Sequence, residues 1–242
     1  AFLKGLGYER TLDYLAANPG LGVKVINMSI GTSALYSGDC DTATSYLMAA
    51  SAVIANLRAA GVIAFASAGN SGSSTQMTAP ACLRGVVSVG ATDTADAVTS
   101  FSNLSSSIDL AAPGYKVVSD AIGGGTVSVS GTSMASPTAA ACAALLLEVQ
   151  PSATPDAIEG GLESTGTPVT RGGVTVPRIR CADALSTIAR YTTRWTDPEH
   201  ARLLQLATRF GTTPSELPRL SVQFVGFLLA LANPRPAPAP VS

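Results

Sequence analysis

A serine with the surroundings of an enzyme nucleophile lies at position 133. Residues 131–137 read Gly-Thr-Ser-Met-Ala-Ser-Pro, and they come where an apolar, strand-like stretch gives way to an alanine-rich, helical one. Small neighbours let a substrate backbone approach Ser133, and the start of a helix stabilises negative charge nearby. Pro137 fits a first helical turn, whose N–H groups have no partner inside the helix. The pattern indicates a nucleophilic serine, with an ordinary serine helix cap as the alternative.

A second segment could supply a hydrogen-bond donor for the same chemistry. Residues 66–72 read Ala-Ser-Ala-Gly-Asn-Ser-Gly, so Asn70 follows a buried strand and stands among small residues. Its side-chain amide can donate two hydrogen bonds. At a strand end, such a donor could stabilise the oxyanion that forms when a carbonyl is attacked. The alternative is a turn asparagine that binds its own backbone.

Six segments together resemble the subtilisin family of serine proteases. Besides the two above, they are residues 25–31, 89–93, 100–103 and 112–114, and both their order and their spacing match the family. The resemblance covers about residues 14–191. It implies an α/β fold with a doubly wound, mostly parallel sheet and helices on both faces. It also implies a serine-type endopeptidase whose peptide substrate lies extended across the carboxyl ends of the strands.

The resemblance assigns expected roles to individual residues. Ser133 would be the nucleophile that forms an acyl-enzyme, and Asn70 the side-chain donor of the oxyanion hole. The pocket for the substrate side chain before the scissile bond would have two walls and a floor, formed by Ser29, Ile30 and Gly31, by Ala66, Ser67, Ala68 and Gly69, and by Thr78. The backbone of the first wall would pair with the substrate main chain. Because Thr78 is neutral, an uncharged substrate side chain is favoured.

The chain departs from the family where the general base should be. In the family the catalytic Asp and His precede the nucleophile, but residues 1–132 contain neither an Asp-Ser/Thr-Gly nor a His-Gly-Thr motif. The only histidine is His200, for which a solvated helix position is a simpler interpretation than a substitute base. We therefore expect a truncated catalytic domain that is nearly inactive as given, since Ser133 needs a base. The alternative function is a pseudoprotease that binds peptides without cutting them.

The hydrophobic pattern predicts the elements that position these residues. Apolar runs indicate buried strands at residues 23–30, 62–66 and 86–89, with a helix at residues 42–60 between the first two. A strand–helix–strand unit of this kind predicts a parallel sheet covered on both faces. Further elements are expected as strands at residues 117–118 and 126–130 and as helices at residues 133–149, from residue 154 and at residues 181–191.

The chain is expected to divide into three parts. A peptidase domain is predicted at residues 1–192, a helical extension with two capping boxes at 193–233, and a Pro/Ala-rich tail at 234–242. The apolar stretch at residues 222–232 is too short to span a bilayer. The extension is expected to dock on the protease core through its apolar side.

Composition argues against several kinds of partner. A net charge of −1 and a pI near 5.8 leave no basic surface for nucleic acid or an anionic membrane. No signal peptide is visible in the first residues, and the four cysteines lack the spacing of a zinc site. Calcium is common in the family, but no dense carboxylate loop identifies a site. We expect a monomer without a cofactor. The resemblance is compatible with a propeptide in the full-length protein.

The cysteines carry a prediction about compartment. The resemblance places Cys40 and Cys82 in segments that meet at a more distant substrate subsite, which predicts a disulfide between them and secretion. Cys142, inside an apolar helix, is predicted to be a buried free thiol. Asp39 and Asp41, which flank Cys40, are interpreted as turn and helix-cap residues.

Overall fold

The computed structural model describes residues 7–191. The predicted helical extension at residues 193–233, the tail at 234–242 and His200 lie outside the described residues.

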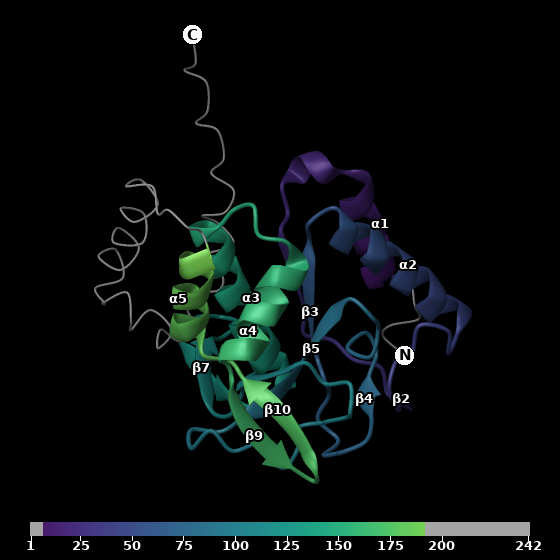
Figure 1. The fold of residues 1–242 in the computed structure, drawn as a ribbon. Helices are drawn as coiled ribbons and strands as arrows, with labels where there is room; N and C mark the ends of the chain where they lie inside the picture. Colours follow the sequence, from purple (N-terminus) through teal and green to yellow (C-terminus); the bar gives the residue numbers. More distant parts are fainter. Residues whose placement is uncertain (1–6, 192–242) are drawn as a thin grey trace.

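A six-stranded sheet forms the centre of the described part (Figure 1). In spatial order its strands are β1 (Val25–Met28), β3 (Ile63–Ser67), β5 (Val86–Thr92), β6 (Leu110–Pro113), β10 (Val174–Arg178) and β9 (Thr167–Arg171). The first five are parallel, and β9 pairs antiparallel with β10. Every residue of β3 and β5 is buried, as expected for parallel strands covered on both faces. The predicted α/β architecture is confirmed.

Two groups of helices cover the two faces of the sheet, and Figure 1 shows them on opposite sides. One group is α1 (Gly7–Ala17) and α2 (Ser45–Ala59); the other is α3 (Thr132–Val149), α4 (Pro155–Thr165) and α5 (Cys181–Tyr191). Alternate residues of β3 serve the two cores: Ile63 and Phe65 pack with the α3 group, Ala64 and Ala66 with the α2 group. The predicted unit of strand, α2 and strand is therefore confirmed.

The helix α3 is the central helix of the larger core. It contacts the four strands β1, β3, β5 and β6, and its buried face consists mainly of small residues. Among the described helices, α3 alone is long and apolar enough to cross a membrane, and half of its apolar window is buried inside the protein. Its composition is accounted for by its place against the sheet.

Smaller elements complete the described part. The strands β2 (Leu35–Tyr36) and β4 (Met77–Thr78), far apart in the chain, form a two-stranded antiparallel sheet. The strands β7 (Val117–Asp120) and β8 (Thr126–Val129) form a hairpin. A 3-10 turn, Pro19–Leu21, follows α1. The hydrophobic pattern predicted β7 and β8, but it missed β6 and the hairpin β9–β10.

Two disulfides link segments far apart in the chain. The predicted Cys40–Cys82 bond is confirmed, with Cα atoms 5.4 Å apart. The prediction of a free thiol at Cys142 was wrong, since Cys142 bonds to Cys181 with Cα atoms 5.7 Å apart. Cys142 lies on α3 and Cys181 begins α5, and these two helices pack together on one face of the sheet. That contact depends on the fold and leaves no sign in the local sequence.

The interpretation of Asp41 as a helix cap was also wrong. The residue that caps α2 is Thr44, whose side chain accepts a hydrogen bond from the N–H of Leu47 over 3.1 Å. Asp41 is instead buried beside the Cys40–Cys82 bond, where Arg84 donates its Nε to Asp41 Oδ2 over 2.7 Å. The carboxylate therefore secures the segment after Cys82.

Candidate active site

Ser133 lies in the first turn of α3, which begins at Thr132. The residue before this turn, Gly131, donates its N–H to the carbonyl of Gly114 over 2.8 Å. A side chain at Gly114 would prevent this approach, because a Cβ there would lie 2.7 Å from the Gly131 oxygen. A first-turn N–H has no acceptor inside the helix, so the N–H of Ser133 lies at the positive end of the helix dipole.

The interpretation of Pro137 as a first-turn residue was wrong. Since α3 begins at Thr132, Pro137 is its sixth residue, and it lacks the N–H that would bind the carbonyl of Ser133 four residues earlier. Ser29 takes that place, because its Oγ donates to the Ser133 carbonyl oxygen over 2.7 Å. Ser29 Oγ in turn accepts a hydrogen bond from Asn27 Nδ2 over 3.1 Å. The segment after β1 is thus bonded directly to the backbone of Ser133.

Asn70 follows β3 and lies beside the start of α3. Its Oδ1 accepts two hydrogen bonds from Thr132, one from the backbone N–H over 2.9 Å and one from Oγ1 over 3.0 Å. Among the described residues, Asn70 Nδ2 donates no hydrogen bond, and it is 3.4 Å from the position that a Cβ on Gly131 would take. The amide nitrogen is therefore available as a donor close to Ser133, while its oxygen is held by the neighbouring residue.

The residues predicted to form a pocket lie together in space. Ser67 Oγ donates to the carbonyl of Ile30 over 3.1 Å and so joins the two predicted walls. Thr78 lies between the glycines of these walls: a Cβ on Gly31 would be 2.8 Å from Thr78 Oγ1, and a Cβ on Gly69 would be 2.8 Å from Thr78 Cγ2. Both positions therefore require glycine.

Burial differs between the two walls. The second wall is interior, since Ala66, Ser67 and Ala68 are buried and only Gly69 is half-buried. The first wall is more open, because Ser29 and Ile30 are half-buried and Gly31 is exposed. The strand β1 ends at Met28, so the backbone of residues 29–31 lies beyond its ladder with β3. An extended chain could pair with it there.

Two supporting residues were missed by sequence reasoning. Thr132 belongs to the serine motif at residues 131–137, but nothing in that pattern indicates that it holds the oxygen of Asn70. Asn103 is the last residue of the family motif at residues 100–103, which by itself predicts no contact for its side chain. In the structure Asn103 Nδ2 donates to the carbonyl of Ala68 over 3.2 Å, and its Oδ1 accepts from the N–H groups of Ser71 and Ser73 over 2.9 and 3.1 Å. The Asn103 side chain thus forms hydrogen bonds with the backbone of the loop that carries Asn70, as a neighbouring strand would in a sheet.

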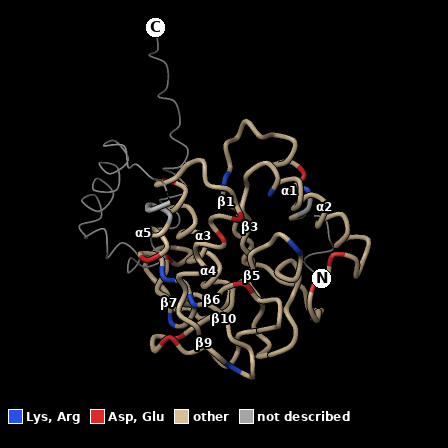
Figure 2. Tube along the Cα trace, viewed as in Figure 1, with Lys and Arg blue, Asp and Glu red and all other residues tan. Residues whose placement is uncertain are grey.

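One cluster of acidic side chains among the described residues can be compared with the needs of a calcium ion. Acidic and basic positions are few and spread over many elements (Figure 2). One group of potential ligands occurs in residues 7–191, formed by Asp109, Glu159 and Glu163, with ligand atoms within 4.8 Å of one another. Glu159 is ion-paired with Arg58, and calcium takes about six to eight oxygen ligands. Three carboxylates beside a guanidinium do not fit that ion.

Comparison with known proteins assigns the family. The family model of the subtilases, a family of peptidases, matches residues 4–179. The chain belongs to the subtilase family. Proteinase R of Parengyodontium album is 41% identical to this subtilase over 135 residues, which cover 56% of this chain and 32% of that protein. The thermophilic serine proteinase of Bacillus sp. (strain AK1) is 42% identical over 125 residues, or 52% of this chain and 28% of that protein. The chain spans about a third of the length of these curated relatives.

Solved structures share the subtilase fold. A cold adapted subtilisin-like serine proteinase aligns with a TM-score of 0.60 and 34% identity, covering 72% of this chain and 60% of that one. The self-cleaved protease domain of PatA aligns with a TM-score of 0.65 and 28% identity, covering 78% of this chain and 69% of that one.

Proposed function

We propose that this subtilase chain carries the nucleophile and oxyanion hole of a serine endopeptidase. The observation that carries the proposal is the position of Asn70, whose Oδ1 is held by Thr132 while Nδ2 remains free to donate beside Ser133. Ser133 Oγ would attack the carbonyl carbon of the scissile peptide and form an acyl-enzyme as the amine leaves. The oxyanion of each tetrahedral intermediate would accept hydrogen bonds from Asn70 Nδ2 and from the N–H of Ser133.

Activity would depend on a base that residues 1–132 do not provide. The proton of Ser133 Oγ must pass to a general base during attack and from an acid to the leaving amine afterwards. The family uses a His oriented by an Asp, and the single histidine of this chain is at position 200. We propose that the family's Asp and His motifs complete the site from upstream, and that the 242 residues alone hydrolyse peptides at most very slowly.

Substrate and setting follow from the same residues. Thr78 occupies the space between Gly31 and Gly69, so the pocket would accept an uncharged side chain. The substrate main chain would pair with residues 29–31. Two disulfides fit a protein that works in an oxidising compartment, and we propose secretion, a monomeric state and no metal held by the described residues.

The test joins an upstream segment to this chain. A fusion protein would carry the Asp and His segment of a relative such as proteinase R before Ala1. We expect hydrolysis of a peptide amide that a serine-directed phosphonate blocks, and its loss in Ser133→Ala. Ser130→Ala is the matched control, because Ser130 Oγ only accepts a hydrogen bond from the N–H of Lys116 and should leave the rate unchanged.

Two outcomes would contradict the proposal. Hydrolysis that persists in Ser133→Ala would mean that another residue is the nucleophile. A folded fusion protein that binds the peptide but never cuts it would favour a peptide-binding pseudoprotease instead.

A further inference from the structure

The loop that carries Asn70 has no strand or helix to hold it. It runs from the end of β3 at Ser67 to β4 at Met77. The Asn103 side chain binds the N–H groups of this loop at Ser71 and Ser73, and the Asn103 N–H donates to the carbonyl of Gly69 over 2.8 Å. Asn103 therefore binds two of the N–H groups in this loop. The carbonyl groups of Gly72 and Ser73 in the same loop accept hydrogen bonds from a further side chain.

The side chain that binds both carbonyls is that of Arg171, the last residue of β9. Its Nη1 donates to the carbonyls of Ser100 and Gly72 over 2.9 and 3.4 Å. Its Nη2 donates to the carbonyl of Ser73 over 3.2 Å and also to that of Ser102. One guanidinium thus joins the loop after Asn70 to the loop that ends in Asn103, through contacts that span 69 to 99 positions of the chain. It adds to two backbone hydrogen bonds between these segments, from the N–H of Gly72 to the carbonyl of Phe101 over 2.7 Å and from the N–H of Leu104 to the carbonyl of Ser73 over 2.8 Å.

Packing at the hairpin tip supports the same contact. Gly172, in the turn after Arg171, has φ +59°, and a Cβ there would lie 2.7 Å from the Cβ of Ser74. The tip of hairpin β9–β10 therefore touches the Asn70 loop with its backbone as well as with the arginine. A glycine is required both by the left-handed backbone and by the close approach.

The partners of Arg171 are dipoles rather than charges. Among the described residues no carboxylate forms an ion pair with Arg171, and its buried Nε has no hydrogen-bond partner. The position of the guanidinium is therefore decided by the backbone carbonyls that its two terminal nitrogens bind. Hydrogen bonds from an ionised donor are shorter and stronger than neutral ones, and the planar fork fixes their directions. A lysine ammonium cannot span both loops in this way.

We propose that Arg171 is a positioning residue for the oxyanion hole, acting through the loop that carries Asn70. This inference rests on the proposed function, because it deepens the role of Asn70. Arg171 binds the carbonyls on one part of the loop and Asn103 binds the N–H groups, so the loop is held in one conformation before substrate arrives. The donor then needs no rearrangement when the oxyanion forms, which is where preorganised donors gain their effect.

The first experiment measures the conformation and protection of the Asn70 loop in the 242-residue chain itself. Hydrogen exchange at the N–H groups of Ser71 and Ser73, and the NMR signal of the Asn70 side-chain amide, would be compared between wild type and Arg171→Lys. We expect exchange at least about 10-fold faster and a shifted or broadened Asn70 signal. Arg178→Lys is the matched control, since Arg178 is on the same hairpin but pairs with Asp96. Unchanged Ser71, Ser73 and Asn70 signals in Arg171→Lys would overturn the proposal.

The second experiment measures, from kcat and KM of the fusion protein, whether the effects of Arg171 and Asn70 are coupled. Arg171→Lys should lower kcat about 10-fold with KM changed less than about twofold, as expected for loss of a transition-state interaction. The same substitution should have almost no further effect in an Asn70→Ala background, where the donor is already absent. An equal loss in both backgrounds would overturn the proposal. Arg171→Gln, which keeps one amide donor, replaces the lysine variant if that variant does not fold.

The two experiments separate this proposal from the proposed function. If the wild-type fusion protein shows no hydrolysis that depends on Ser133, the proposed function fails. The exchange and NMR measurements on the chain still decide whether Arg171 holds the Asn70 loop.

Discussion

The hydroxyl of Ser29 donates a hydrogen bond to the backbone carbonyl of Ser133 over 2.7 Å, at the one helical position whose normal donor is replaced by Pro137. Ser29→Ala should leave this carbonyl without a partner and reduce the free energy of unfolding by about 1 kcal/mol. The loss should shrink in a Pro137→Ala background, because residue 137 then regains an N–H for the helix. Urea denaturation of the two single variants and the double variant measures this coupling. An equal loss in both backgrounds would show that Ser29 acts elsewhere.

Thr132 is predicted to affect catalysis through Asn70. Thr132→Val keeps the shape of the side chain but removes the Oγ1 that donates to Asn70 Oδ1 and accepts from the N–H of Gly69 over 3.1 Å. In subtilisin, removal of one side-chain donor of the oxyanion hole lowers kcat by about 10²–10³. We expect a smaller loss, about 10-fold, in the fusion protein, because Asn70 keeps the backbone bond. Thr132→Ser is the control, and it should retain most of the rate. A normal kcat in Thr132→Val would mean that Asn70 needs no second support.

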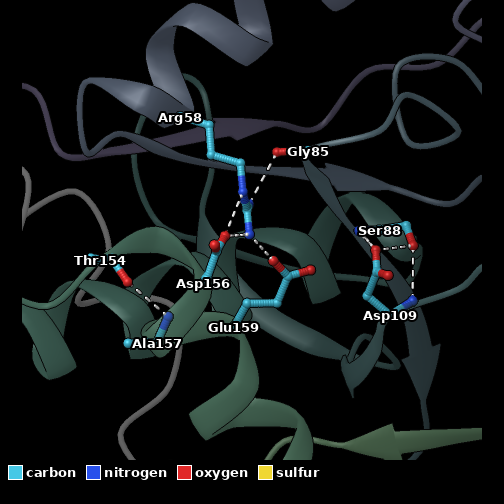
Figure 3. A network of polar contacts seen from close by, with 8 residues as sticks. All are labelled: Arg58, Gly85, Ser88, Asp109, Thr154, Asp156, Ala157 and Glu159. Carbon is cyan, nitrogen blue, oxygen red and sulfur yellow. Dashed lines mark hydrogen bonds and ion pairs between the residues drawn. The ribbon is translucent and has the colours of Figure 1, made fainter.

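Asp109 should make stability depend on pH. Its carboxylate accepts hydrogen bonds from the N–H and Oγ of Ser88 over 2.7 and 2.8 Å, and Figure 3 shows this pair beside the group of Arg58, Asp156 and Glu159. Burial, together with the charge of Glu159, raises the pKa of Asp109 to about 6 despite the Ser88 bonds. The folded state therefore favours the protonated form. The resulting stability is complete below the unfolded pKa, near 4, and is lost as pH rises through about 6.

Asp109→Asn tests this sign. The amide oxygen can still accept the Ser88 bonds, but it does not ionise. Relative to wild type, the variant should gain on the order of 1–3 kcal/mol as pH rises from about 4 to about 7. Thermal unfolding across that pH range measures the difference. Asp156→Asn, which removes an exposed ion pair with Arg58, should give a small loss rather than a gain. A variant of Asp109 that loses stability relative to wild type toward neutral pH would contradict the prediction.

The two disulfides should contribute similarly to stability. Cys40–Cys82 and Cys142–Cys181 close loops of 42 and 39 residues. In the chain-entropy model each bond restricts the unfolded chain by about 4 kcal/mol, and the two values differ by less than about 0.1 kcal/mol. Paired Cys→Ser variants, compared by urea denaturation under non-reducing conditions, measure each contribution. Because Cys142 and Cys181 join two core helices, a much larger loss at this pair would show that packing rather than loop closure dominates. Peptide mapping of the oxidised protein should find all four thiols bonded.

Local sequence was sufficient for much of the framework. The strands that contain Ile63 and Val86 were predictable because parallel strands buried on both faces are continuously hydrophobic. The helix between residues 45 and 59 was predictable because its apolar residues recur on one face. The family motifs also predicted that Ser133, Asn70 and the two pocket walls belong to one site. Short-range patterns carry this information because the backbone at these positions demands particular residue types, such as glycine at position 31 beside Thr78.

Long-range partners could not be obtained in this way. Nothing near Ser29 indicates that it replaces the helical donor of Ser133, and nothing near Cys142 indicates Cys181, because both contacts depend on how α3 crosses the sheet. Hairpin β9–β10 was missed for a related reason: its prolines and glycines weaken the alternating pattern, and it is stabilised by pairing with β6. The sequence around Arg171 gives no reason to expect more than a charged surface residue. Arg171 acquires a role only when the hairpin brings its guanidinium to the carbonyls of the Asn70 loop, because hydrogen bonds act over about 3 Å whatever the separation along the chain.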